Sequence, residues 1–285
     1  MFEVRILSLA SDGVVGVGIL RLRFCFTSRS KILAQDDRAF MTWVKICGMT
    51  NLEDALVAVD AGADAVGFVF YEKSPRYVTV EMAREIVEKL PESVEKIGVC
   101  VNGEAVDPFD ALSGAGLTGV QTYPSMAVSA GADRLKAVSA SSLRPRAKFL
   151  MALPMNLFGK DEGEVQNTAA DFANCGKTLA EFSSRSQGLL DTFVLDSGDL
   201  RQPGGTGKAF DWKRALPMVE GMRQGGLKLV VAGGLNPDNV GEAMGILQPW
   251  GVDVVSGVEA SPGKKDPEKV RAFVRAVREM DRRVS

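Results

Sequence analysis

Residues 42–70 read TWVKICGMTNLEDALVAVDAGADAVGFVF and contain two short apolar runs on either side of an amphipathic stretch. The runs Val44–Met49 and Ala65–Phe70 are rich in residue types that favour strands. The stretch Leu52–Ala61 between them has apolar residues at helical spacing. A strand, a helix and a second strand in this order predict two parallel strands joined by a helical crossover.

The same alternation continues to the end of the chain and predicts one closed (β/α)8 TIM barrel, an α/β fold, over residues 42–285. A doubly wound open sheet is the alternative, but the first loop lacks a GxGxxG motif. Residues Gly159–Gln187 are polar and are expected to form a long loop and the fifth helix. The eight predicted strands are Val44–Met49, Ala65–Phe70, Lys96–Asn102, Gly119–Tyr123, Lys148–Leu153, Thr192–Ser197, Leu227–Gly233 and Val252–Gly257. The clearest predicted helices are Leu52–Ala61, Val80–Leu90, Asp211–Met218, Asn239–Leu247 and Pro267–Met280.

Residues 1–41 precede this pattern and are expected to be a poorly ordered N-terminal extension, with Met41 opening the working protein. Their apolar runs are too short to span a bilayer, and Glu3 and Arg5 do not suit a signal peptide. The alternation in Val17–Phe24 would fit a strand. No membrane association is therefore expected.

Composition narrows the chemistry that the chain can perform. With 34 basic and 36 acidic residues the net charge is −2, which offers no general attraction for nucleic acid. Four cysteines without CxxC spacing favour a reduced, cytoplasmic location. The sequence has no histidine, which removes the commonest general base and most zinc sites. Cys, Asp, Glu, Lys and Tyr remain as candidates for proton transfer.

Glycines follow the last two predicted strands, at the barrel end where chemistry takes place. Gly233-Gly234 and Ser256-Gly257 would let backbone N–H groups approach an oxyanion, which predicts a phosphate site. Purely steric chain turning is the alternative for either motif. Gly205, within Gly204–Gly207, would contact the ligand or belong to a hinge.

An ordered set of motifs resembles the phosphoribosylanthranilate isomerase family of tryptophan biosynthesis. The motifs are KICGMT, GADAVGFVF followed by SPR, LDS, GGTGKAFDW, AGGL with NPDNV, and SGVEASPGKKD, and only residues 124–192 lack a landmark. The resemblance implies an Amadori rearrangement of a phosphorylated small molecule without metal or organic cofactor, by a monomer or homodimer. It also implies Cys47 as base, Asp196 as acid and Arg76 as the partner of a substrate carboxylate.

Structural explanations compete with each of these roles. Cys47 could be a small buried apolar residue, Asp196 could cap a turn, and Arg76 could pair with Glu72 on the surface. Lys45 shares the inward face of its strand with Cys47, and the neighbouring eighth strand offers Asp253 as its ion-pair partner.

Two positions depart from the family's usual pattern. Tyr123 stands in VQTYP where the family has VQLHG, and Val255 replaces the first serine of SSGVE. Both departures concern hydrogen bonding at the mouth and neither replaces the expected acid or base. The related histidine-pathway isomerase, which uses an aspartate at the first strand, and a non-catalytic phospholigand-binding barrel remain as alternatives.

Overall fold

A computed structural model of the chain describes residues 5–9, 15–19, 41–101, 106–123, 147–155, 169–185, 190–197 and 210–284. The chain divides into two units, Met1–Phe40 and Met41–Ser285, and each is described by itself. In the first unit β1 (Arg5–Leu9) pairs antiparallel with β2 (Val15–Ile19). The predicted strand Val17–Phe24 overlaps β2 only as far as Ile19. The expected poor order of the extension concerns residues that mostly lie outside the described ranges and stays a prediction.

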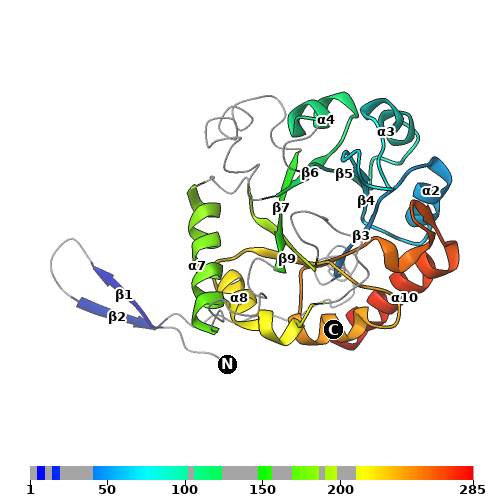
Figure 1. The fold of residues 1–285 in the computed structure, drawn as a ribbon. Helices are drawn as coiled ribbons and strands as arrows, with labels where there is room; N and C mark the ends of the chain where they lie inside the picture. Colours follow the sequence, from blue (N-terminus) through cyan, green and yellow to red (C-terminus); the bar gives the residue numbers. More distant parts are fainter. Residues whose placement is uncertain are drawn as a thin grey trace, which may run out of the picture. The chain divides into compact units, whose positions relative to one another are not determined.

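In the second unit eight parallel strands close into a barrel, which forms the inner ring in Figure 1. The last strand pairs with the first, Gly251 beside Trp43 and Asp253 beside Lys45, and this pairing closes the barrel. The predicted TIM barrel is confirmed, and the open-sheet alternative is wrong. The strands are β3 (Trp43–Cys47), β4 (Ala65–Val69), β5 (Glu95–Val99), β6 (Gly119–Thr122), β7 (Lys148–Pro154), β8 (Thr192–Asp196), β9 (Lys228–Val231) and β10 (Gly251–Val254).

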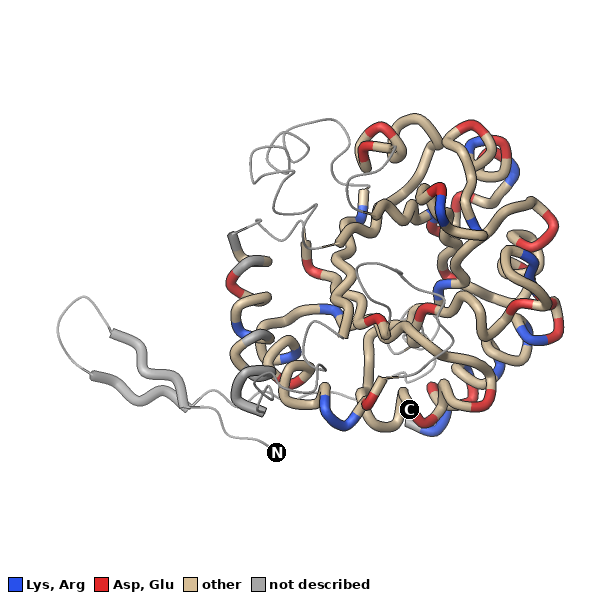
Figure 2. The backbone as a smooth tube through the Cα atoms, in the orientation of Figure 1, with Lys and Arg blue, Asp and Glu red and all other residues tan. Residues whose placement is uncertain are grey.

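Helices surround the strands as an outer ring that carries most of the charged residues in Figure 2. Side-chain caps fix where several of them begin: Asn51 accepts from the N–H of Asp54, and Thr79 from that of Met82. The helices are α2 (Leu52–Asp60), α3 (Val80–Val87), α4 (Pro108–Gly114), α7 (Ala169–Arg185), α8 (Trp212–Gln224), α9 (Val240–Leu247) and α10 (Pro267–Val284). None of the described helices is long and apolar enough to cross a bilayer.

The predicted helices are found, but α3 ends at Val87, before the expected Leu90, and two others are longer than expected. Helix α10 continues past Met280 to Val284. Helix α8 continues past Met218 to Gln224 although Pro217 lies within it. Val219 and Met222 are buried on the face shared with Met218, so packing extends the helix past its predicted end despite the proline. Helix α7 provides the helix expected within Gly159–Gln187, whereas residues 156–168 lie outside the described ranges.

Side chains fill the barrel interior in layers, because successive residues of each strand alternate between the inside and the helices. The lowest layer is apolar and contains Trp43, Ala65, Ile97, Leu150, Val194 and Val230. The layer above contains the buried polar side chains Lys45, Gln121 and Asp253. Cys47 is the next inward residue of β3, one layer nearer the mouth. The strands therefore direct polar chemistry to their C-terminal ends.

Candidate active site at the barrel mouth

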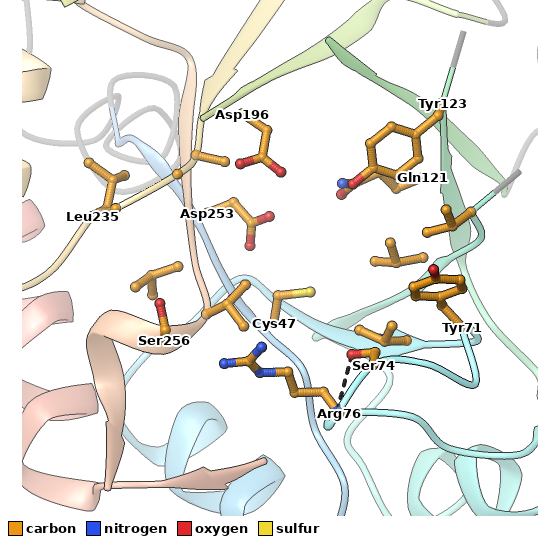
Figure 3. A pocket seen from close by; sticks show the side chains of 18 residues that line it. Cys47, Tyr71, Ser74, Arg76, Gln121, Tyr123, Asp196, Leu235, Asp253 and Ser256 are labelled. Atoms are coloured by element: carbon orange, nitrogen blue, oxygen red, sulfur yellow. Dashed lines mark hydrogen bonds between the residues drawn. The ribbon is translucent and has the colours of Figure 1, made fainter. Parts of the chain in front are cut away.

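A pocket opens at the C-terminal ends of the strands, with an empty volume of about 670 Å³ that includes space open to solvent. Figure 3 shows side chains from several strands pointing into it. Its lining contains Cys47, Val69, Tyr71, Ser74, Arg76, Val99, Val101, Gln121, Tyr123, Asp196, Ala232, Gly233, Gly234, Leu235, Asp253, Val254, Val255 and Ser256.

Cys47 ends β3 and directs its thiol into this pocket (Figure 3). Gly67 on the adjacent strand makes room for it, because a Cβ atom at residue 67 would lie 2.5 Å from Sγ of Cys47. Burial raises the pKa of the thiol, and the positive charge of Lys45 offsets part of that rise. The thiol is thus protonated in most free molecules at neutral pH, and its thiolate is a strong base when formed.

Lys45 lies directly below Cys47 and is completely buried. Its Nζ donates to Oδ2 of Asp253 at 2.8 Å and to Oε1 of Gln121 at 3.1 Å. The predicted interior ion pair is confirmed. Burial alone would lower the pKa of Lys45, but the negative charge of Asp253 and its hydrogen bond outweigh burial and raise it, so Lys45 stays charged. The second oxygen of Asp253, Oδ1, is buried without a hydrogen-bond partner in the described part of the chain.

Arg76 extends from the loop after β4 across Gly48 and into the mouth. Glycine at residue 48 has no Cβ atom, which would lie only 3.1 Å from Cγ of Arg76. Glycine also adopts the φ of +81° found there without strain. The guanidinium donates through Nε to Oε1 of Glu259 at 3.1 Å and through Nη2 to Oε2 at 2.7 Å. Its side chain is 12% exposed and paired with Glu259, so the alternative of a surface pair with Glu72 is wrong.

The two glycine-containing strand ends meet at one edge of the pocket. Gly233 and Gly234 both have positive φ, +78° and +65°, and no acceptor in the described ranges uses their N–H groups. A Cβ atom at Gly257 would lie 1.9 Å from the carbonyl oxygen of Leu235, so the two loops are in direct contact. Ser256, at the start of the short 3-10 helix η2 (Ser256–Val258), lines the pocket beside them. The convergence of these loops was predicted. Gly257 packs against the loop after β9 but does not itself line the pocket.

Asp196 ends β8 and lines the pocket together with Cys47, as Figure 3 shows. Tyr123 faces the same space and is 3% exposed. Burial and then the nearby charge of Asp196 raise the pKa of the Tyr123 phenol well above its ordinary value, so Tyr123 is a hydrogen-bond donor there. Of the positions predicted from the sequence, Gly205 lies outside the described residues.

Several residues of this site were not predicted as such. Glu259 and Lys265 contact each other beside Arg76, and Oε1 of Glu259 accepts from Nζ of Lys265 at 3.1 Å. The motif that contains them was noticed, but its fold into a hairpin of β11 (Glu259–Ser261) and β12 (Lys264–Lys265) was not. Asp253 was predicted only as the partner of Lys45, although strand alternation also placed it inside the barrel.

Comparisons with known proteins agree with this geometry. The family described as N-(5'phosphoribosyl)anthranilate (PRA) isomerase matches residues 44–129 and 167–276. The unmatched residues between them fall within the stretch where no motif was recognised.

Individual relatives carry the same description. The N-(5'-phosphoribosyl)anthranilate isomerase of Citrifermentans bemidjiense is 40% identical over 235 residues, 82% of this chain and 96% of that protein. Its counterpart from Pseudomonas fluorescens is 41% identical over 234 residues, 82% of this chain and 97% of that protein. The crystal structure of phosphoribosyl anthranilate isomerase from Thermotoga maritima matches 84% of this chain and 100% of its own, with 35% identity and a TM-score of 0.62. The chain therefore belongs to the N-(5'-phosphoribosyl)anthranilate isomerase family.

Proposed function

We propose that the chain isomerises N-(5'-phosphoribosyl)anthranilate in tryptophan biosynthesis, with Cys47 as general base and Asp196 as general acid. The observation that carries this proposal is that Cys47, Asp196, Arg76 and the two glycine-containing loops all line one pocket. Each group suits a different part of that substrate, which combines an aromatic carboxylate, a ribose ring and a phosphate.

Binding would use two sets of donors that line the pocket. The N–H groups of Gly233 and Gly234 and the hydroxyl of Ser256 suit the phosphate, since they are donors at one edge. Arg76 suits the carboxylate, because a guanidinium has a second face, Nη1 and Nη2, beside the Nε face that Glu259 occupies. The ribose would then lie between Cys47 and Asp196.

The chemistry requires one proton to be given and another to be taken. Asp196 would protonate the furanose ring oxygen as the bond from that oxygen to C1′ breaks, and the nitrogen lone pair forms an iminium ion. Cys47, as thiolate, would then take the C2′ proton. The electron pair of the broken C2′–H bond forms the C1′–C2′ double bond, and the iminium π electrons return to nitrogen. The resulting enolamine tautomerises to the ketone. The iminium charge makes C2′ more acidic and stabilises a nearby thiolate, which counters the raised pKa of Cys47.

The reaction can be followed directly with freshly prepared phosphoribosylanthranilate, whose anthranilate-type fluorescence falls on isomerisation. Loss of that signal at a rate proportional to enzyme supports the proposal. Tight binding of the substrate without turnover would support the phospholigand-binding barrel instead. The histidine-pathway alternative is disfavoured because Cys47 occupies the first-strand position where that enzyme uses an aspartate.

The assembly and location of the chain are further proposals. One structural relative is described as mutually generated monomers of a dimeric phosphoribosylantranilate isomerase from Thermotoga maritima, with 35% identity and a TM-score of 0.58. We expect a monomer or homodimer in the cytoplasm, and light scattering of the purified chain distinguishes the two states.

A further inference from the structure

Among the described residues, four N–H donors surround the carboxylate of Glu259. Its two oxygens accept from Nε and Nη2 of Arg76, from the N–H of Gly263 at 3.2 Å and from Nζ of Lys265 at 3.1 Å. The Glu259 side chain is only 4% exposed. A buried carboxylate surrounded by donors is stable in this place only as an anion.

Lys265 supplies the charge that balances this carboxylate. Its side chain is fully buried, and its Nζ also donates to the carbonyl oxygen of Val255 at 3.2 Å. Although burial raises the pKa of Glu259, the hydrogen bonds from Arg76 and the charge of Lys265 hold it below its ordinary value. Burial lowers the pKa of Lys265, and the charge of Glu259 and its hydrogen bond oppose that decrease. With Lys265 protonated, Arg76, Glu259 and Lys265 together carry one net positive charge, of which Arg76 is the part that lines the pocket.

The hairpin Glu259–Lys265 is fixed to the loops that carry the site. The hydroxyl of Thr50 donates to the carbonyl of Gly263 at 2.6 Å, and a Cβ atom at Gly263 would lie 2.8 Å from the carbonyl oxygen of Pro75. The N–H of Lys265 donates to Oδ2 of Asp54 at 2.7 Å. The hairpin thus contacts both the loop after β3 and the segment that contains Arg76, which gives Glu259 a rigid support.

We propose that Glu259, balanced by Lys265, is a positioning residue that orients Arg76 so that its outer Nη face recognises the substrate carboxylate. This inference rests on the proposed function of Arg76 and deepens it. Glu259 accepts from Nε and from Nη2 of the guanidinium, so Nη1 and the second N–H of Nη2 are not used by Glu259. The Arg76 side chain lines the pocket (Figure 3). Lys265 supplies the extra charge, since without it the Arg76–Glu259 pair would be neutral and would attract an anion weakly.

The test is the change Glu259→Gln, which preserves size but exchanges one acceptor oxygen for an NH2 donor. Because Arg76, Gly263 and Lys265 all donate, the new NH2 group would face at least one other donor. Arg76 would then lose one of its two hydrogen bonds to residue 259. Exposed Glu268 in the first turn of α10 provides the control, Glu268→Gln, with the same change of charge.

Two inhibitors separate carboxylate recognition from everything else: reduced 1-(o-carboxyphenylamino)-1-deoxyribulose 5-phosphate, which is bound in a related structure, and its analogue without the ring carboxylate. The native protein should bind the carboxylated inhibitor roughly 10- to 100-fold more tightly, the range for charge-assisted hydrogen bonds. Glu259→Gln should reduce the ratio of the two affinities about tenfold, because it weakens binding of the carboxylated inhibitor and leaves binding of the analogue unchanged. It should also raise KM for the substrate more than it lowers kcat. The control should keep the native ratio.

Three outcomes would overturn the inference or its basis. An unchanged ratio in Glu259→Gln, with Arg76→Gln abolishing it, would remove Glu259 from recognition but leave the proposed role of Arg76. An unchanged ratio in Arg76→Gln would refute both. If Glu259→Gln does not fold, Glu259→Asp takes its place, because it keeps the charge but moves the carboxylate one methylene away from Arg76. A native affinity ratio in Glu259→Asp would show that the observed hydrogen-bond geometry is not needed.

Discussion

The ion pair between Lys45 and Asp253 allows a quantitative test of how charge is accommodated inside the barrel. Replacing Lys45 by Met removes the cation but keeps a similar length, and leaves the Asp253 carboxylate 5% exposed and without its 2.8 Å bond from Nζ. Because Oδ1 of Asp253 already lacks a partner among the described residues, neither oxygen would be satisfied. Breaking one side of a buried pair costs about 3–5 kcal/mol.

For a chain of this size that loss lowers the thermal midpoint by roughly 2–4 °C per kcal/mol, and so by about 10 °C. The double change Lys45→Met with Asp253→Leu removes both charges, and replacement of a buried pair by apolar side chains is often neutral or stabilising. The double variant should therefore recover most of the stability lost by the single one. Urea unfolding and thermal melts of the three proteins provide the assay. Equal stability of the single and double variants would refute the importance of the unpaired carboxylate.

Three further predictions test other parts of the structure. Gly67→Ala places a methyl group 2.5 Å from Sγ of Cys47, so kcat should fall at least about tenfold while overpacking costs only roughly 1–3 kcal/mol; native kcat would contradict the close approach. Asp281→Ala removes bonds from the N–H of Thr42 at 3.2 Å and from its hydroxyl at 2.6 Å, which tie α10 to the start of β3. It should lower the free energy of unfolding by about 1–3 kcal/mol, and an unchanged urea midpoint would show that these hydrogen bonds do not stabilise the fold. Because the pKa of Glu259 is lowered in the folded state, its stabilisation is present above its unfolded pKa of about 4.3 and is lost as pH falls. The stability difference between native protein and Glu259→Gln should therefore shrink between about pH 6 and pH 3, and parallel curves would be inconsistent with an ionised Glu259.

The sequence predicted the start of each strand better than its end. Met49, Phe70 and Ala232 continue the apolar runs of their strands and are buried, but they lie beyond the last residue of β3, β4 and β9. An apolar pattern indicates which residues are buried, not which are paired in a sheet. Residues at the mouth stay buried after the strand pairing has ended. Strand bounds from the apolar pattern alone are therefore too long at this end of the barrel, except for β7, which continues one residue past its predicted end at Leu153.

Contacts between distant segments divide into those that strand register implies and those that it does not. Register and alternation were sufficient to predict the Lys45–Asp253 pair, because β10 must lie beside β3 in a closed barrel. The pair of Arg76 and Glu259 joins residues 183 positions apart through a loop and a hairpin. No periodic pattern fixes the course of either segment, so the nearer Glu72 was the only protein side chain that the sequence suggested as a partner of Arg76.

The most direct test of the proposed chemistry is the steady-state kinetics of Cys47→Ser with freshly prepared phosphoribosylanthranilate. Serine preserves the shape of the pocket, but its hydroxyl ionises at far higher pH than a thiol. If Cys47 takes the C2′ proton, kcat should fall by roughly 10²- to 10⁴-fold while KM changes little. A variant that keeps nearly native kcat would exclude the thiol as base and leave a carboxylate of the pocket to take that proton.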